Sequence, residues 1–508
     1  MFQRSAMRGL PPADHASFQA FGSGPTAAVE FDRVHHAFEK QAACLPHAIA
    51  VEHLGTSKTY QELDHLAERL ADVLVDRGVR PDDRVGLFLT RSIPMVVGIL
   101  AVLKAGAAYV PQDVRITPPG HLRHVVRTAG IQVVLTTSEH APALPDGIGE
   151  VVVVDTIPDG AAVRRRGPEG ETAAVIFTSG TSGNPNGVQV THANLCNVLL
   201  TEPGSLGITP GTRVAQLLNI AFDMAVWETL GTLAHGGTLV IRGDDIQATA
   251  SSVHVVIATP SILSSLDPGV CDQVRTVAVA GERCPRALAD TWSRTTSFYN
   301  ACGPTEVTII NTMQRYDPRA GTVTIGRPVP NTTVYVLDDE LRPCRIGEIG
   351  EMWAGGACVT AGYQGNDALT AERYRPDPFL GAGNRMFRTR DLGRWTPDGQ
   401  LEHHGRTDDQ VKVRGFRVEL DAVTAALERA DGCARATTLV HNGRLVGFVS
   451  PATAAPEPAR RAVEQVLPYY CVPTLIVPVD TLPMTDRGKV DLRALLSRLD
   501  GQPKETVA

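Results

Sequence analysis

The chain has 508 residues, too many for one hydrophobic core, so two or three domains are expected. Apolar residues make up 43% of the sequence and charged residues 20%, which excludes a disordered chain. The net charge of −7 argues against a nucleic-acid-binding protein, because such a face needs clustered Lys and Arg.

Targeting signals and cysteine spacing both favour a cytoplasmic protein. The N-terminus has no apolar segment of the kind found in secretory signals. The most apolar stretch, residues 93–110, contains Pro94 and Lys104, so a buried helix and strand explain it better than a membrane span. The nine cysteines show no CxxC pair, which favours free thiols over a disulfide framework or a zinc site.

In chain order, helix-period and strand-period segments alternate. Residues 1–25, rich in Pro, Gly, Ser and Ala, are expected to form a flexible arm ahead of a core that spans residues 26–407. Residues 59–78 have the spacing of an amphipathic helix. Short apolar runs, predicted to be buried strands, lie at residues 82–90, 131–137 and 150–155. This alternation predicts an α/β architecture with parallel sheets.

The pattern changes after about residue 320. Residues 322–330, 331–339 and 347–356 read as hairpin strands separated by Gly and Pro turns. A small α+β domain is expected over residues 408–508, with a hairpin at 436–450 and helices at 421–432 and 457–470; its length suits a minor domain.

A glycine-rich loop follows the short apolar strand at residues 173–177. Hydroxyl groups interleaved with glycines can present many N–H and O–H donors to phosphate oxygens. It is not a Walker loop, because no Gly-Lys-Ser/Thr sequence closes it and another strand follows. A flexible hairpin turn is the alternative from composition alone. The residues of this loop are Thr178, Ser179, Gly180, Thr181, Ser182 and Gly183.

This loop resembles the signature of adenylate-forming enzymes, and specifically of nonribosomal peptide synthetase adenylation domains. Further segments similar to that family follow one another in the same order, at residues 34–52, 59–63, 103–113, 221–228, 300–308, 347–356, 387–395, 405–420, 467–473 and 484–491. The resemblance implies a large N-terminal domain of parallel-rich α/β subdomains with a small β-barrel-like subdomain, followed by a small mobile α+β C-terminal domain. It also implies ATP-dependent activation of an amino-acid carboxylate.

The resemblance assigns the nucleotide-binding residues. Carboxylate attack on the α-phosphorus of ATP joins two anions, so catalysis depends on positioning and on cationic stabilisation. Glu306 is expected to hold Mg²⁺, and Thr305, beside Gly303, to contact phosphate. Asp391 is expected to accept the two ribose hydroxyls, and Arg406 to contact ribose or phosphate. A surface ion pair is the alternative for these last two.

Lys489 is the residue expected to bridge the substrate carboxylate and the α-phosphate, since a long stem with a compact charge suits that role. A surface lysine in a turn is the alternative for its tetrapeptide alone. The small domain is expected to rotate about a hinge at Asp408, which brings Lys489 in for adenylation and removes it for thioester formation. Lys412 and Gly415 would then face the carrier's pantetheine arm.

The amino-acid pocket also follows from the resemblance. Asp223 is expected to start a helix, which it can also cap, and to pair with the substrate's α-ammonium; a role as helix cap alone is the alternative. The remaining positions are apolar, so a hydrophobic L-amino acid is expected, aliphatic first and aromatic second. One methylene is worth only about 1–3 kcal/mol in such a pocket, so some promiscuity follows. Besides Lys489, these positions are Met224, Trp227, Ile257, Ala278, Ala280, Ala301, Ile309 and Ile310.

Several positions depart from the family pattern. Asn186 replaces the lysine that usually closes the glycine loop, and Cys302 replaces the aromatic residue that stacks on adenine. Arg390 replaces a glycine beside Asp391, and the pair Asp421-Ala422 replaces the family's usual Gly-Glu. The first two changes remove favourable contacts with ATP, so a degenerate fold that binds without turnover is an alternative to an active enzyme.

The expected partners follow from what the sequence contains. There is no Gly-Gly-His/Asp-Ser carrier motif, so a free-standing enzyme with a separate phosphopantetheine-bearing carrier protein is expected, with a small activator protein possible. An acid–CoA ligase is the nearest enzymatic alternative, although it gives no reason for Asp223. The pairs His35-His36 and His403-His404 are interpreted as surface or structural residues, not as a condensation motif.

Overall fold

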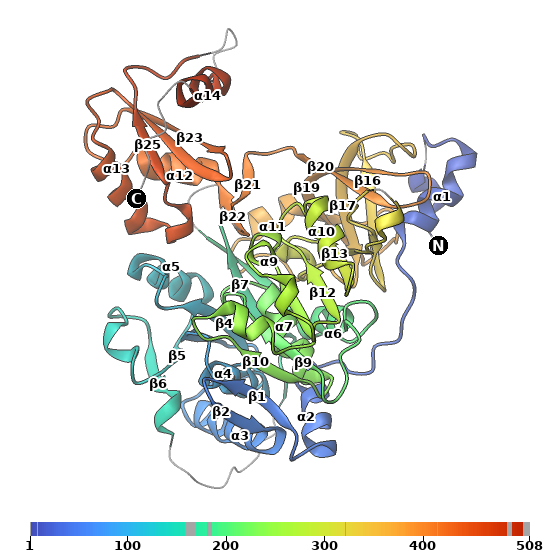
Figure 1. The fold of residues 1–508 in the computed structure, drawn as a ribbon, viewed down its shortest axis with the longest axis vertical. Coiled ribbons are helices and arrows are strands. Elements are labelled where there is room, and N and C mark those ends of the chain that lie inside the picture. Colours follow the sequence, from blue (N-terminus) through green and yellow to red (C-terminus); the bar gives the residue numbers. More distant parts are fainter. Residues whose placement is uncertain are drawn as a thin grey trace. The chain divides into compact units, whose positions relative to one another are not determined.

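The computed structural model describes residues 2–7, 9–157, 168–179, 185–320, 322–413, 415–484 and 490–500. The contacts divide the chain into two compact units (Figure 1). Unit 1 consists of Met1–Arg115, Val125–Thr178 and Asn186–Asp408. Unit 2 consists of Ile116–His124, Ser179–Pro185 and Asp409–Ala508. The long C-terminal part of unit 2 therefore begins directly after Asp408.

A six-stranded sheet of unit 1 has the order β6-β5-β3-β4-β7-β8, and all its neighbours are parallel except β7 and β8. Its parallel strands are apolar runs with almost no exposed residue, as expected where helices cover both faces. The strands predicted at residues 82–90, 131–137 and 150–155 are confirmed. The six strands are β3 (Arg84–Leu89), β4 (Ala108–Asp113), β5 (Val133–Thr136), β6 (Glu150–Val153), β7 (Thr172–Thr178) and β8 (Asn186–Thr191).

A nine-stranded sheet of unit 1 has the order β15-β14-β13-β12-β11-β9-β10-β1-β2. The strands from β13 to β1 in this order are parallel, and antiparallel strands flank them. The strands are β1 (Ile49–His53), β2 (Thr56–Thr59), β9 (Arg213–Gln216), β10 (Thr238–Ile241), β11 (Val255–Ala258), β12 (Thr276–Val279), β13 (Ser297–Cys302), β14 (Thr312–Arg315) and β15 (Arg327–Pro328).

The helices of this part of the chain include the predicted amphipathic one. Thr59 caps it by accepting from the Glu62 backbone N–H, while the Glu62 carboxylate accepts from the Thr59 N–H, which is a capping box. The helices are α2 (Val34–Cys44), α3 (Tyr60–Asp76), α4 (Ile93–Lys104), α5 (Pro119–Ala129), α6 (His192–Leu199), α7 (Met224–Ala234), α8 (Ile246–Ala250), α9 (Pro260–Ser264), α10 (Arg286–Trp292) and α11 (Asp367–Arg373).

The hairpin-rich segment after residue 320 forms a five-stranded antiparallel sheet. The predicted strand at 331–339 pairs with that at 347–356, with Thr332 opposite Gly356. The strands are β16 (Thr332–Leu337), β17 (Gly350–Gly356), β18 (Tyr374–Pro376), β19 (Arg385–Trp395) and β20 (Leu401–Arg406).

The segment expected to be a flexible N-terminal arm is folded where the structure describes it. Residues 12–22 form helix α1 (Pro12–Gly22), and Phe18 is fully buried. Its ring stacks on Tyr335 at 6.3 Å and lies 5.6 Å from Phe379. The expectation of an arm is therefore wrong for this helix, because composition weighed the prolines and glycines and overlooked the buried aromatic residues.

The C-terminal part of unit 2 has its own core, centred on Val418, Val423, Leu427 and Val449. Its hairpin and helices match the predicted α+β pattern. Its elements are β21 (Gln410–Val413), β22 (Phe416–Glu419), α12 (Leu420–Leu427), β23 (Arg435–His441), β24 (Arg444–Ser450), α13 (Pro456–Val466), β25 (Leu475–Pro478) and α14 (Leu492–Asp500). Among the described residues no helix combines the length and apolarity that crossing a bilayer requires.

Candidate active site

One face of the nine-stranded sheet gathers the apolar residues expected to line the pocket. Ile257 on β11 lies opposite Ala278 on β12 in register, so the two side chains share a face. Both belong to the main hydrophobic cluster of unit 1, whereas the adjacent Val277 and Val279 belong to the cluster on the other face. The remaining predicted lining residues are buried members of the same main cluster, namely Met224, Trp227, Ala280, Ala301, Ile309 and Ile310.

Helix α7 is fixed over this cluster by two buried polar groups. The indole Nε1 of Trp227 donates to the carbonyl of Gly204 at 2.7 Å. The carboxyl of Glu228 accepts from the backbone N–H groups of Leu217, at 2.7 Å, and Leu218, at 3.2 Å, just after β9. Burial raises the pKa of Glu228 to about 8, so this group is protonated at neutral pH.

Asp223 stands directly before α7 and is half-buried. Its side chain makes no capping hydrogen bond, so the expected capping role is wrong, although the helix does begin at the next residue. The following side chain, Met224, belongs to the apolar cluster. The Asp223 carboxylate therefore lies at the N-terminal end of α7, next in sequence to Met224, the first residue of this helix in the apolar cluster.

Glu306 lies in the short 3₁₀ turn Thr305–Val307 between β13 and β14, and is fully buried. The hydroxyl of Tyr363 donates to its Oε1 at 2.7 Å. The Glu306 carbonyl accepts from the backbone N–H of Thr360 at 3.1 Å and from its hydroxyl at 3.0 Å. Both the backbone and the carboxylate of this residue are therefore held in place.

The backbone around Glu306 is tightly packed and strained. A Cβ on Gly303 would lie 2.6 Å from the Cα of Ile310 and 2.9 Å from the carbonyl oxygen of Ile309, so only glycine fits there. Thr308 and Ile309, both β-branched, have φ values of 60° and 70°, in the left-handed region that such residues rarely adopt. Strain of this kind is concentrated at functional sites.

The donor set at this turn suits Mg²⁺. Mg²⁺ prefers oxygen ligands and is usually held by one or two carboxylates together with substrate phosphates. Glu306 supplies the carboxylate, and the Tyr363 hydroxyl hydrogen-bonds its Oε1. The neighbouring Thr305, which is half-buried, adds a hydroxyl.

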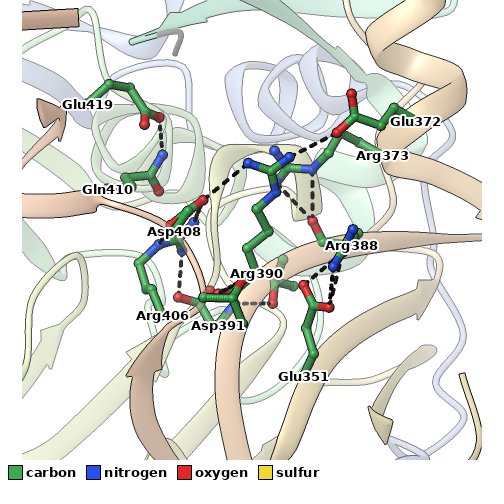
Figure 2. Close-up of polar contacts among 12 residues, drawn as sticks. Glu351, Glu372, Arg373, Arg388, Arg390, Asp391, Arg406, Asp408, Gln410 and Glu419 are labelled. Carbon is green, nitrogen blue, oxygen red and sulfur yellow. Dashed lines mark hydrogen bonds and ion pairs between the residues drawn. The ribbon is translucent and has the colours of Figure 1, made fainter. Parts of the chain in front are cut away.

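The second polar group of unit 1 lies where β19 pairs with β20. Asp391, nearly buried, is opposite Arg406 in register, and the Arg406 Nη1 donates to its Oδ1 at 2.5 Å. The same guanidinium donates from Nε and Nη2 to Asp408, at 2.7 and 3.1 Å. The structure therefore brings together Asp391, Arg406 and Asp408, as Figure 2 shows.

His403 joins this group through an irregularity of β20. Its Nε2 lies 3.3 Å from Asp391 Oδ1, the oxygen that Arg406 also contacts. In a regular strand residues 403 and 406 would point to opposite faces. The register shifts by one residue between Asp391 and Gly393, and Gly405 has a φ of 98°, which marks a bulge that returns both side chains to Asp391.

Arg390, the departure from the family glycine, has a φ of 61°. A left-handed conformation costs a non-glycine residue about 1–2 kcal/mol. Its Nη2 lies 2.9 Å from Glu372 Oε1, and its Nη1 lies 3.5 Å from Asp408 Oδ2. The positive charge at this position is thus directed to Asp408 as well as to Glu372.

The glycine-rich loop is described only at its edges. Thr178 ends β7 and pairs with Asn186 at the start of β8, which confirms that the loop connects two strands. The Ser179 hydroxyl donates to the Arg417 carbonyl at 2.9 Å, within unit 2. The expected phosphate-binding residues Gly180, Thr181, Ser182 and Gly183, and the expected catalytic Lys489, lie outside the described residues.

Sequence reasoning missed two residues that contact predicted site residues, Tyr363 and His403. No local motif marks Tyr363, and its bond to Glu306 spans 57 residues. His403 was interpreted as structural, and only the glycine two positions later hints at the bulge that turns it toward Asp391. His35 is buried, and the His36 Nε2 donates to Glu169 Oε1 at 3.0 Å, in agreement with a structural interpretation.

Comparison with known proteins identifies the family of the chain. The family model described as "AMP-binding enzyme" matches residues 38–364. The chain is 46% identical to adenylate-forming reductase 03009 of Coprinopsis cinerea over 96% of this chain and 48% of the relative. It thus spans about half the length of that protein. It is 35% identical to novobiocin biosynthesis protein H of Streptomyces niveus, covering 94% of this chain and 84% of the relative.

Solved structures give the same result for the fold. PA1221, a nonribosomal peptide synthetase protein containing adenylation and carrier (PCP) domains, superimposes with a TM-score of 0.82 at 26% identity. The alignment covers 93% of this chain and 98% of that one. The expected α/β fold, with a large N-terminal part and a small C-terminal part, is confirmed.

Proposed function

Because the chain belongs to the family of AMP-binding enzymes, we propose that it uses ATP to activate the carboxylate of a hydrophobic L-amino acid. A carboxylate oxygen attacks the α-phosphorus, the bond to the bridging oxygen of pyrophosphate breaks, and aminoacyl-AMP and pyrophosphate result. The observation that supports this proposal most directly is the buried, hydrogen-bonded Glu306, in the turn that directly precedes the lining residues Ile309 and Ile310.

Each residue has a proposed part in this step. Glu306 would hold Mg²⁺, which supplies positive charge to the phosphate oxygens, and Thr305 would donate to phosphate. Asp391 would accept the ribose hydroxyls, and Arg406 would neutralise charge on the nucleotide. Lys489 would join the carboxylate to the α-phosphate, and the C-terminal domain would then rotate about Asp408.

The substrate class follows from the contrast between Asp223 and the apolar cluster beside it. A half-buried carboxylate is stabilised by a bound cation, which the α-ammonium of an amino acid provides. The lining residues offer no polar side chain to a substrate side chain, which favours apolar over polar amino acids; among the apolar ones we propose aliphatic first and aromatic second.

The fate of the adenylate is the second part of the proposal. We propose transfer to the phosphopantetheine thiol of a carrier protein in the biosynthesis of a natural product, with release of AMP. The neighbouring structure that contains both an adenylation and a PCP domain supports this acceptor. The 46% identity to an adenylate-forming reductase favours a second candidate, in which the acyl group is subsequently reduced by a further domain or protein.

Pyrophosphate exchange tests the activation step. Labelled pyrophosphate should enter ATP in the presence of aliphatic L-amino acids, and far less with the same acids lacking the amino group, such as 4-methylpentanoate beside L-leucine. The variant Asp223→Ala should lose this preference. Equal exchange rates with L-leucine and 4-methylpentanoate in the wild type would refute the assignment of Asp223. If none of the acids supports exchange, the result would favour a degenerate fold.

Acceptor specificity is tested by trapping the product. Holo-carrier protein, apo-carrier protein and coenzyme A are each incubated with the chain, ATP and the best amino acid. Acylation of the holo-carrier alone supports the proposed acceptor. Acylation of coenzyme A would favour an acid–CoA ligase instead.

A further inference from the structure

Arg390 combines an unfavourable backbone conformation with contacts that converge on the end of unit 1. Its φ of 61° lies in the left-handed region, at a position where the family it resembles has glycine. A strained residue persists when its surroundings or its function maintain it. What the arginine side chain does at this position therefore needs an explanation.

Arg390 contacts the last two residues of unit 1, Thr407 and Asp408. Its carbonyl accepts from the backbone N–H of Thr407 at 2.9 Å and from the Thr407 hydroxyl at 3.3 Å. Its guanidinium lies between Glu372, at 2.9 Å, and Asp408, at 3.5 Å, as Figure 2 shows. Asp408 is the residue at which the contacts divide the chain into its two units.

A second cation beside Asp408, Arg406, also contacts the nucleotide-binding candidate Asp391. Arg406 makes a two-pronged contact with Asp408, at 2.7 and 3.1 Å, and at the same time donates to Asp391 at 2.5 Å. A ribose on Asp391 would compete for this oxygen, and a phosphate would attract Arg406. The ribose removes the contact that holds Arg406 on Asp391, and a phosphate then withdraws the guanidinium from Asp408, whose side chain is only 16% exposed.

We propose that Arg390 is a positioning residue that keeps Asp408 neutralised and in place when Arg406 turns to the nucleotide. The proposal rests on the proposed function of the site. A mostly buried carboxylate that loses its cation is costly, and Arg390 removes that cost because it remains paired with Asp408. Without Arg390, Asp408 would retain Arg406 and weaken nucleotide binding.

The test uses the full chain and ATP with Mg²⁺, titrated calorimetrically. Arg390→Gln, which keeps the Cβ and removes the charge, should raise the Kd for ATP about fivefold, as expected for coupling within one ion-pair network. Arg390→Lys should restore part of the affinity. The matched control is Arg388→Gln, which removes an arginine two residues earlier on β19 that pairs with Glu351, and should leave the Kd unchanged.

A double variant separates this role from a general effect on folding. Asp408→Asn removes the negative charge that Arg390 neutralises. In this background Arg390→Gln should cause no further loss of ATP affinity. Arg390→Gly should lose affinity as Arg390→Gln does, although it relieves the backbone strain and should unfold at the same or a higher temperature. An unchanged Kd in Arg390→Gln, or an equal loss in both backgrounds, overturns the proposal.

Failure of the proposed function gives a different result. If the wild type binds ATP but exchanges no pyrophosphate with any acid, the proposed function fails, and the calorimetric series still decides the role of Arg390. If the wild type does not bind ATP with Mg²⁺, both proposals are overturned.

Discussion

The Glu306 carboxylate is buried, and the Thr360 hydroxyl hydrogen-bonds the Glu306 carbonyl and so fixes the backbone of the turn. We expect Glu306→Gln to lower the rate of pyrophosphate exchange about 10²-fold, because the amide cannot supply the negative oxygen that holds Mg²⁺. The fold should persist, since Tyr363 can donate to the amide oxygen. Tyr363→Phe, which keeps the carboxylate, should cost about tenfold or less. Exchange at the wild-type rate in Glu306→Gln would contradict the assignment.

The close packing around Gly303 leads to a second prediction, on the stability of the same turn. Gly303→Ala would place a Cβ 2.6 Å from the Ile310 Cα, which is backbone and cannot move aside. We expect a loss of about 1–3 kcal/mol in the free energy of unfolding together with lower exchange activity. Thermal unfolding and exchange measure both. Gly120→Ala, whose Cβ would meet its nearest neighbour at 3.4 Å, is the control and should be close to neutral.

The sequence predicts the position of some site residues and not of others. Ile257 and Ala278 could be placed together because strand alternation and parallel register determine which side chains share a face. Tyr363 could not, because a contact between distant segments leaves no local periodicity. Asp223 was placed correctly before a helix but wrongly as its cap, since a residue at that position can point its side chain away from the first turn.

At the scale of elements, α7 depends on a protonated acid. The pKa of Glu228 is raised from 4.5 to about 8 by burial, so its protonated form stabilises the fold fully below about pH 4.5. This contribution is lost as the pH rises toward 8, so the free energy of unfolding should fall by roughly 4 kcal/mol over that interval. Glu228→Gln cannot ionise and should not show this part of the pH dependence.

Urea unfolding at pH 5, 6.5 and 8, followed by tryptophan fluorescence, measures this difference. The four tryptophans, Trp227, Trp292, Trp353 and Trp395, all lie in unit 1 and are almost fully buried, so they report on the unit that contains Glu228. An identical pH dependence in the variant and the wild type would show that Glu228 is ionised throughout.

Most elements could be predicted, and the exceptions have specific causes. The helix at Tyr60–Asp76 follows from its periodicity and its capping box, which are local signals. Helix α1 was missed because the stability of its segment comes from Phe18 packing against Tyr335 and Phe379, more than 300 residues away in the chain. Composition alone does not reveal such a partner.

At the scale of the whole molecule, the two units have separate cores. Among the clusters that the described residues show, those built from unit 1 residues end at Leu401, before the boundary. A chain truncated after Asp408 should therefore retain buried tryptophans and cooperative unfolding. It should lose pyrophosphate exchange, because Lys489 is removed. Lys489→Ala in the full chain is the matched variant and should lose exchange to a similar degree; substantial exchange by the truncated chain would contradict the proposed role.

The bulge at Gly405 makes strand β20 more sensitive to a substitution of this glycine than to a substitution of His403. Substituting His403 removes one contact to Asp391 and leaves the contact from Arg406 in place. Straightening the bulge at unchanged chain length would restore strict alternation and send one of the two side chains to the opposite side of the sheet. Gly405→Ala, which the φ of 98° disfavours, should therefore disturb both contacts to Asp391, whereas replacing His403 disturbs one of them.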